Sequence, residues 1–374
     1  MTPLQMVDLT TQYKHLRKEI EKAVQDVLRS GKYINGAAVD ALAAGLSEYL
    51  DVKYVIPCAN GTDALQIALM ALDLQQEDEI IVPAFTYAAT AEAIALLKLT
   101  PVLVDVDPLT FNIDVKKVEE VVTPRTRAIV PVHLFGQTAD MEPLMQIARK
   151  YGLSVIEDNA QSIGSTYTFQ DGTKKQAGTI GTIGTLSFFP TKNLGAYGDG
   201  GALLTGDEDL AKKIKMIARH GQSQKYMHER IGCNSRLDTL QAAILNVKLP
   251  YLNTYNQIRI RTAEEYNAQL KPLSHLLDVP HCAAQSTHVY HQYTVKIKQD
   301  RDKVQKHLQE KGVPTMIYYP LPLHHQPAFK YILKKGSNLN ESENLCRSVL
   351  SLPMHTELDK EQIQYIIDQL RSYE

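Results

Sequence analysis

Lys192 has sequence surroundings that favour a reactive amine. It follows the apolar run at residues 186–190 and precedes a glycine-rich segment at residues 195–201. Most lysines lie on the solvated surface, which is the ordinary alternative. Desolvation lowers the pKa of a lysine and supplies the neutral amine that a Schiff base with a carbonyl group requires. The sequence therefore predicts Lys192 as a nucleophile.

Residues 60–65 could bind a phosphate. Gly61 allows close approach of the backbone, and a helix beginning near Thr62 would direct N–H groups and a positive dipole at an anion. The alternative is an ordinary strand-to-helix turn with Thr62 or Asp63 as its N-cap. Taken alone, this segment favours the turn, because capping is the commonest use of such residues.

Two acids and an aromatic residue also follow apolar runs. Asp158 and its neighbour Glu157 end one run, where a carboxylate can hold a cationic ring nitrogen or cap the next helix. Tyr87 follows another run and can stack on a flat heteroaromatic ring or be a core residue. An amine, a phosphate site, an acid and a stacking aromatic together are the groups that bind pyridoxal 5′-phosphate.

The elements that must position these residues alternate between strands and helices. Strands are predicted at residues 54–58, 79–83, 101–106, 128–133 and 153–157, with helices at 64–74, 88–98 and 141–151. This alternation argues for a mainly parallel sheet covered by helices on both faces. Ligands of such sheets collect beyond the C-terminal strand ends, where the candidate residues lie.

The pattern changes after residue 206 and predicts a second domain. Helices are expected at residues 210–219, 237–248 and 251–270, then a strand at 289–297 and helices at 302–311 and 360–371. We therefore expect a large cofactor-binding domain at residues 1–250, including an N-terminal helix. A linking helix and a small C-terminal α/β domain would occupy residues 251–374.

Composition excludes several classes of protein. The 374 residues carry a net charge of −2 with the charges interspersed, so we expect no nucleic-acid partner. The four cysteines have neither zinc-site nor disulfide spacing, which favours a cytoplasmic protein without a metal. The longest near-apolar stretch, residues 80–97, is interrupted by polar residues, and no membrane span or signal peptide is expected.

The sequence resembles the DegT/DnrJ/StrS family of sugar aminotransferases, in the fold-type-I (aspartate aminotransferase-like) superfamily. The motifs that carry this resemblance span essentially the whole chain, at residues 31–36, 60–65, 86–90, 157–161, 187–192, 198–201 and 232–238. The resemblance implies a PLP transferase fold, with a mainly parallel sheet flanked by helices and a small C-terminal α/β domain. It also implies a homodimer with active sites at the interface.

The resemblance implies a role for each matching residue. Lys192 forms the Schiff base, Asp158 pairs with the ring nitrogen and Gln161 approaches the ring hydroxyl. Lys192 then moves a proton between the amino donor and the cofactor, and pyridoxamine 5′-phosphate is the intermediate form of the cofactor. The amino donor implied is L-glutamate. The remaining residues implied are Tyr87 on the ring face, Gly61, Thr62 and Ser187 at the phosphate, and Asn234 at the phosphate of the neighbouring subunit.

Within the family, the sequence is similar to 3-aminotransferases that act on UDP-2-acetamido-2-deoxy-3-keto-glucuronate in bacterial surface polysaccharide (lipopolysaccharide, O-antigen) synthesis. A uronate carboxylate needs a cationic or donor-rich pocket, for which four residues are candidates. Arg236 could instead pair with Asp238, and the tyrosines could simply pack between domains. The alternative substrate is a dTDP-3-keto-6-deoxyhexose. The candidates are Arg236, Tyr318, Tyr319 and His324.

Three other classes of protein are weaker alternatives to a sugar aminotransferase. A dehydratase on the same fold would carry His in place of Lys192. A sensor or regulatory protein that retains the fold would be expected to lose part of the site, which is complete in this sequence. An NAD-dependent sugar dehydrogenase needs an N-terminal G-x-G-x-x-G fingerprint, and the glycine run at residues 195–201 does not match it.

Overall fold

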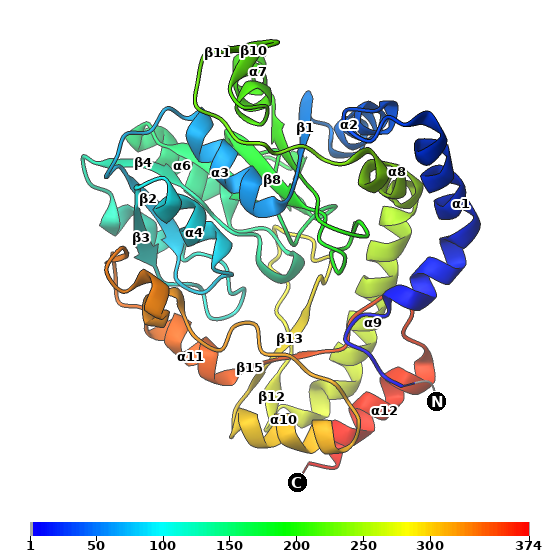
Figure 1. Cartoon of the computed structure of the whole chain (residues 1–374). Coiled ribbons are helices and arrows are strands. Elements are labelled where there is room, and N and C mark those ends of the chain that lie inside the picture. Colours follow the sequence, from blue (N-terminus) through cyan, green and yellow to red (C-terminus); the bar gives the residue numbers. More distant parts are fainter. Residues whose placement is uncertain (1–2, 374) are drawn as a thin grey trace.

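The computed structural model describes residues 3–373 and has a mainly parallel central sheet (Figure 1). Its eight strands have the order β1-β9-β8-β5-β4-β2-β3-β14, and only β9 runs antiparallel to its neighbours. The strands are β1 (Tyr54–Cys58), β2 (Glu79–Pro83), β3 (Thr100–Val104), β4 (Thr126–Ile129), β5 (Ser154–Asp158), β8 (Ile183–Ser187), β9 (Gly201–Thr205) and β14 (Lys334–Lys335).

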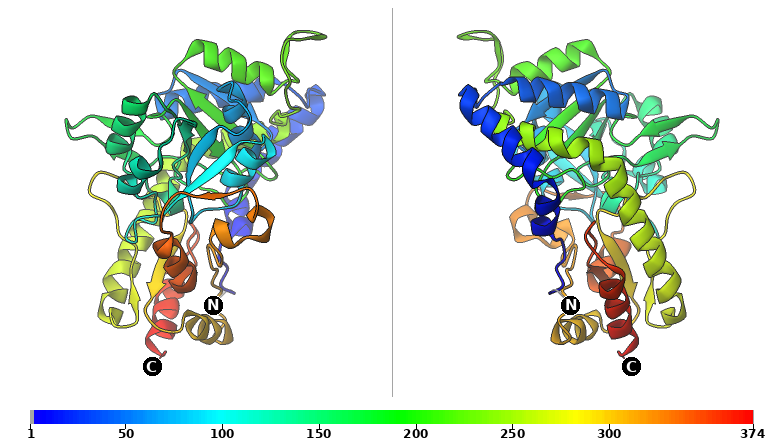
Figure 2. Two further views of the ribbon diagram at one scale, coloured as in Figure 1. Left: turned by 90° about the vertical axis from the view of Figure 1, so that its left-hand side faces the viewer. Right: turned by 90° about the vertical axis from the view of Figure 1, so that its right-hand side faces the viewer.

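Helices cover both faces of this sheet (Figure 2). Ile156 of β5 packs into a core shared with one set of helices, whereas its neighbour Val155 packs into a core on the opposite face. Both faces are thus buried, which explains the apolar runs without polar alternation. One face carries α3 (Gly61–Ala71), α4 (Ala89–Leu96) and α7 (Glu208–Ile217), and the other carries α2 (Ala37–Leu50), α5 (Val115–Val118), α6 (Met141–Tyr151) and α8 (Thr239–Lys248).

The N-terminal helix α1 (Leu9–Ser30) lies outside this layer, against α8. Asp8 caps α1 by accepting a hydrogen bond from the backbone N–H of Thr11 at 2.9 Å. Leu16 and Ile20 of α1 pack against Ile244 of α8 in a small core of their own. The helix therefore gains its stability from a narrow apolar stripe on an otherwise polar surface.

The C-terminal part has a separate apolar core around Tyr266 and Tyr293. A three-stranded antiparallel sheet lies beside the long helix α9 in this part and shares its apolar core. The elements are α9 (Leu252–Leu270), β12 (Leu277–Asp278), β13 (Tyr293–Ile297), α10 (Arg301–Glu310), β15 (Val349–Leu352) and α12 (Lys360–Arg371). Two short hairpins project elsewhere, β6 (Thr166–Thr168) with β7 (Lys174–Gln176), and β10 (Gln222–Gln224) with β11 (Met227–His228).

One C-terminal segment returns to the central sheet. Strand β14 pairs with β3, and Lys334 forms an ion pair with the buried Glu79 at 3.0 Å. Buried Asp105 accepts the backbone N–H groups of Glu341 and Ser342 at the start of α11 (Asn340–Ser348). Residues beyond 250 thus contribute to the large sheet as well as to their own, and the boundary at residue 250 stays a prediction.

The predicted fold class is confirmed, although several element bounds differ. The helix expected at residues 64–74 begins at Gly61. The strand expected at residues 128–133 is β4, which ends at Ile129, and the one expected at 289–297 begins at Tyr293. Among residues 3–373, no helix combines the length and apolar character that a membrane crossing requires.

Candidate active site

A cavity of about 570 Å³ lies beyond the C-terminal ends of β2, β5 and β8. Residues from the C-terminal part also line it, so its wall combines segments far apart in the chain. This is the place where an open parallel sheet is expected to bind ligands. The site residues that the sequence predicts and that line this cavity are Gly61, Thr62, Tyr87, Asp158, Gln161, Ser187, Lys192, Tyr318 and Tyr319.

One end of the cavity fits a phosphate. The side chain of Asn60 caps α3 by accepting the backbone N–H of Asp63 at 2.8 Å, so the expectation that Thr62 or Asp63 is the cap is wrong. Gly61 and Thr62 are then the first helical residues, whose N–H groups have no partner inside the helix. Gly61 also abuts Ser187, since an added Cβ would lie 2.8 Å from the Cβ of Ser187.

Asp158 provides a buried carboxylate in the same cavity. It is 5% exposed and accepts hydrogen bonds from the Thr90 hydroxyl at 2.9 Å and the Ala160 N–H at 3.2 Å. Burial raises the pKa of Asp158, while these two bonds and the charge of Lys192 oppose the rise. A cation bound beside it, such as a protonated ring nitrogen, would favour the charged carboxylate.

Lys192 lies five residues beyond the end of β8 and lines the cavity. Burial lowers its pKa to about 8, although the nearby Asp158 carboxylate favours the charged form. A substantial neutral fraction therefore exists just above neutral pH, which gives the nucleophilic amine that the sequence predicts.

Aromatic residues also line the cavity. Tyr87 is 60% exposed, so its alternative as a core residue is wrong, and its ring centroid lies 6.0 Å from that of Tyr319. Gln161 accepts the backbone N–H of Phe135 at 2.9 Å and donates to the Tyr319 hydroxyl at 3.3 Å. Tyr318 lines the same cavity. The tyrosine pair therefore both packs and reaches the cavity.

Three predicted residues do not line this cavity. Asn234 is exposed and pairs through its backbone with Arg219. Arg236 lines a separate small hollow beside Asn35. His324 forms an ion pair with Glu343 at 3.0 Å. Their predicted roles stay predictions.

His324 belongs to a group of possible metal ligands. One atom each of His324, His325 and Glu343 lies within 4.8 Å of the others. The contacts of His324 and His325 with Glu343, at 3.0 and 3.6 Å, equally suit ordinary ion pairs. The prediction that the protein binds no metal is untested.

The sequence did not single out several other residues of the cavity wall. His291 is buried, which lowers its pKa well below the ordinary value, and the charges of Lys192 and Arg259 lower it further. It enters the cavity from a segment nearly a hundred residues beyond Lys192, and no local pattern indicates that contact. The residues missed are Thr86, Phe189, Asp199, His291 and Gln292.

Residues 14–371 match the DegT/DnrJ/EryC1/StrS aminotransferase family. The chain belongs to this family. It is 46% identical to the pleiotropic regulatory protein of Geobacillus stearothermophilus over 98% of each chain. It is 46% identical to the UDP-2-acetamido-2-deoxy-3-oxo-D-glucuronate aminotransferase of Pseudomonas aeruginosa over 97% of this chain and 98% of the relative. It is 38% identical to the dTDP-3-amino-3,4,6-trideoxy-alpha-D-glucose transaminase of Streptomyces venezuelae over 98% of this chain and 95% of that relative.

A solved relative agrees in fold and carries a cofactor. NtdA of Bacillus subtilis, solved with its bound cofactor PMP, has a TM-score of 0.90 and 34% identity, covering 99% of this chain and 85% of NtdA. The cavity of this aminotransferase fits the same kind of group, because it brings together an amine, an acid and a helix N-terminus. The protein is a pyridoxal-phosphate-dependent aminotransferase, as the sequence predicts.

Proposed function

We propose that this aminotransferase transfers an amino group from L-glutamate to C3 of a nucleotide-linked keto sugar, UDP-2-acetamido-2-deoxy-3-keto-glucuronate, in bacterial surface polysaccharide synthesis. The likeness to the Pseudomonas aeruginosa enzyme over nearly the whole of both chains carries this proposal. The tyrosine pair supports it, since both residues line the cavity and a uronate carboxylate needs hydrogen-bond donors.

The residues of the cavity have distinct tasks in this proposal. The cofactor, when bound, supplies an aldehyde and an electron sink. Asp158 holds the ring nitrogen in its cationic form, and the N-terminus of α3 binds the phosphate beside Ser187. Tyr87 would stack on the ring. The amine of Lys192 would attach the cofactor and would then accept the proton from the amino-bearing carbon of the donor.

The second candidate substrate is a dTDP-3-keto-6-deoxyhexose. The Streptomyces venezuelae relative supports this alternative, at lower identity. Kinetics with both keto sugars separate the two, and we expect the UDP-linked uronate to have the higher kcat/KM. A clear preference for the dTDP-linked sugar would remove the uronate.

We also infer that two chains form a homodimer and share their active sites. The β10–β11 hairpin protrudes from the body (Figure 1), and Ile231, just after it, is 87% exposed. Asn234 and Arg236 follow directly and lie outside the cavity of their own chain. An apolar residue so exposed suits burial against a second copy, which would carry both polar residues to the partner's cavity. We propose that this dimer works in the cytoplasm.

Lys192→Ala tests the proposed catalytic base. We expect turnover to fall by at least about 10²–10⁴-fold, because general base catalysis contributes that much. The melting temperature should be preserved, because burial disfavours the charged form of Lys192 and its amine therefore adds little to stability. An activity near wild type would refute the assignment of Lys192 as the catalytic base.

Borohydride reduction followed by peptide mass spectrometry locates the attachment point. Lys248 is a matched internal control, because burial lowers its pKa to about 8 as well, yet it does not line the cavity. We expect the cofactor mass on Lys192 alone. A label on Lys248, or no label at Lys192, would contradict the proposal.

A further inference from the structure

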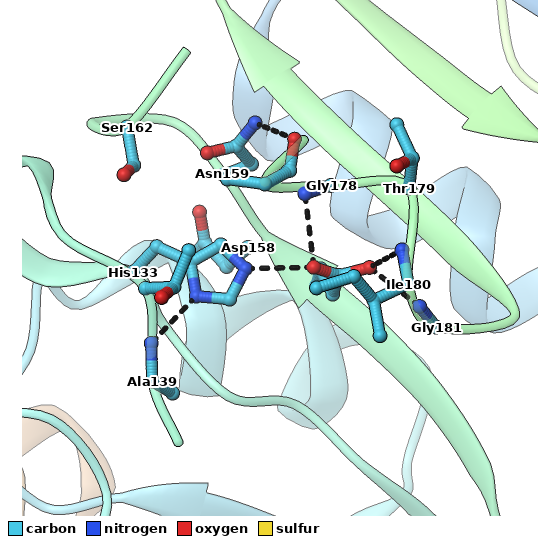
Figure 3. Close-up of polar contacts among 12 residues, drawn as sticks. His133, Ala139, Asp158, Asn159, Ser162, Gly178, Thr179, Ile180 and Gly181 are labelled. Atoms are coloured by element: carbon cyan, nitrogen blue, oxygen red, sulfur yellow. Dashed lines mark hydrogen bonds and ion pairs between the residues drawn. The ribbon is translucent and has the colours of Figure 1, made fainter. Parts of the chain in front are cut away.

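A second buried carboxylate lies next to Asp158 and takes no part in the cavity. Glu157 is fully buried and does not line it. Successive side chains of a strand point to opposite faces, so Glu157 lies on the face of β5 away from Asp158. Figure 3 shows the imidazole of His133 directed at this carboxylate, with the loop at residues 178–181 around the same group.

The hydrogen bonds of this pair define its chemistry. The Nδ1 of His133 accepts the backbone N–H of Ala139 at 3.1 Å, so its Nε2–H donates to Glu157 at 2.8 Å. Three backbone N–H groups also donate to Glu157, from Gly178 at 2.9 Å, Ile180 at 2.6 Å and Gly181 at 2.5 Å. Four donors compensate a buried anion, which is otherwise costly.

The same pair is connected to Asp158 through the backbone. The N–H of His133 donates to the carbonyl of Asp158 at 3.0 Å, and the N–H of Asp158 donates to the carbonyl of Pro131 at 2.9 Å. On the other side, the Thr185 hydroxyl donates to the carbonyl of Glu157 at 3.2 Å. The His133–Glu157 bond therefore locks the segment after β4 onto the end of β5, where Asp158 begins its turn into the cavity.

The locked segment also reaches the cavity wall. Phe135, two residues after His133, lines the cavity and donates its N–H to Gln161. A displacement of His133 would thus move the supports of both Asp158 and Gln161. Residues that hold a ligand-binding group in place commonly matter almost as much as the group itself.

We propose that His133 and Glu157 form a positioning pair that holds Asp158 against the ring nitrogen of the cofactor. The inference rests on the role proposed for Asp158. Neither residue of the pair lines the cavity, so the pair acts through the strand end and the segment that it joins, and through the charge of His133, which lowers the pKa of Asp158.

Two substitutions of His133 isolate the bond to Glu157. His133→Gln places an amide nitrogen near the position of Nε2 and can still donate to Glu157. His133→Asn places an oxygen near Nδ1, which keeps the bond from Ala139 but does not reach Glu157. The probe is pyridoxamine 5′-phosphate, which has no aldehyde for Lys192, compared with its analogue in which C–H replaces the ring nitrogen. Both dissociation constants are measured with the full chain.

We expect His133→Asn to raise the dissociation constant of pyridoxamine phosphate about tenfold, which is the cost of a lost hydrogen bond to a charged group. The dissociation constant of the analogue should change little. His133→Gln should stay near wild type for both probes. His355→Asn is the matched control, because His355 is buried, accepts a backbone N–H through Nδ1 and lies outside the cavity. It should lower only the melting temperature.

Two results would overturn the positioning pair. One is equal weakening of both probes by His133→Asn, which is what a merely structural role would give. The other is equal loss in the Gln and Asn variants. Asp158→Asn serves as the reference, since it should weaken the binding of only the probe that has the ring nitrogen. If this reference shows no such preference, the role proposed for Asp158 fails first.

Discussion

At the scale of residues, Asp158 and Lys192 are both shifted toward their neutral forms. Burial raises the pKa of Asp158 and lowers that of Lys192, and their mutual attraction offsets these shifts only in part. Such a pair is held ready for a ligand that supplies its own charges. A ring cation stabilises the carboxylate, and the neutral amine is free to attack an aldehyde.

The pKa of Lys192 predicts the pH dependence of cofactor capture by the protein without cofactor. Only the neutral amine attacks, so the rate of pyridoxal phosphate attachment should rise with pH and reach its midpoint near pH 8. Asp158→Asn removes an attraction that raises the pKa of Lys192, so the midpoint should move to lower pH. Stopped-flow absorbance measures both profiles. A midpoint that stays in place or rises would show that the two residues are not coupled.

At the scale of elements, the contact between α3 and β8 shapes the phosphate end of the cavity. Gly61→Ala would place a methyl group 2.8 Å from the Cβ of Ser187, whose backbone lies directly behind it. We expect a loss of about 1–3 kcal/mol in the free energy of unfolding, as overpacking costs, and weaker cofactor binding because α3 tilts away from β8. Chemical denaturation and cofactor titration measure the two effects.

Gly206→Ala is the control for that substitution. An added Cβ at Gly206 meets no atom within 4 Å, so stability and cofactor affinity should remain near wild type. If Gly61→Ala behaved like Gly206→Ala, the close approach of α3 to Ser187 would not shape the binding site.

The sequence predicted those elements whose burial leaves a local signal. Strands β1 and β2 and helix α6 begin and end where predicted, because apolar runs and turn residues mark them. Strand β9 and strand β14 were not predicted. The first follows a glycine-rich loop, and the second is two residues long and depends on pairing with β3. Tertiary packing brings residues such as His291 into the cavity, and no local sequence pattern predicts that position.

At the scale of the whole molecule, the C-terminal part completes a site that the large sheet begins. Tyr318 and Tyr319 border the cavity, and the segment that follows them is tied back to the sheet through Glu79 and Asp105. Both carboxylates are buried and bonded, so this segment is fastened to the large sheet. The proposed dimer would add Asn234 of the second chain as the remaining piece.

Mixed dimers test whether Asn234 serves the partner's cavity. Asn234→Asp places a negative charge where a phosphate is expected, so this variant alone should be inactive, as should Lys192→Ala alone. If Asn234 acts across the interface, each mixed dimer has one site with both defects and one site with none. Random assortment of the two variants, expressed together with different tags, should then recover about a quarter of wild-type activity.

The opposite arrangement gives an opposite result. If Asn234 served the cavity of its own chain, every site in a mixed dimer would carry one defect, and no activity would return. Ile231→Asp in both chains is the control for the interface, because a charge at this exposed apolar residue should disfavour burial against a second copy. It should abolish the recovery and shift the mass measured by light scattering to that of a single chain, since the recovered sites exist only in the mixed dimer.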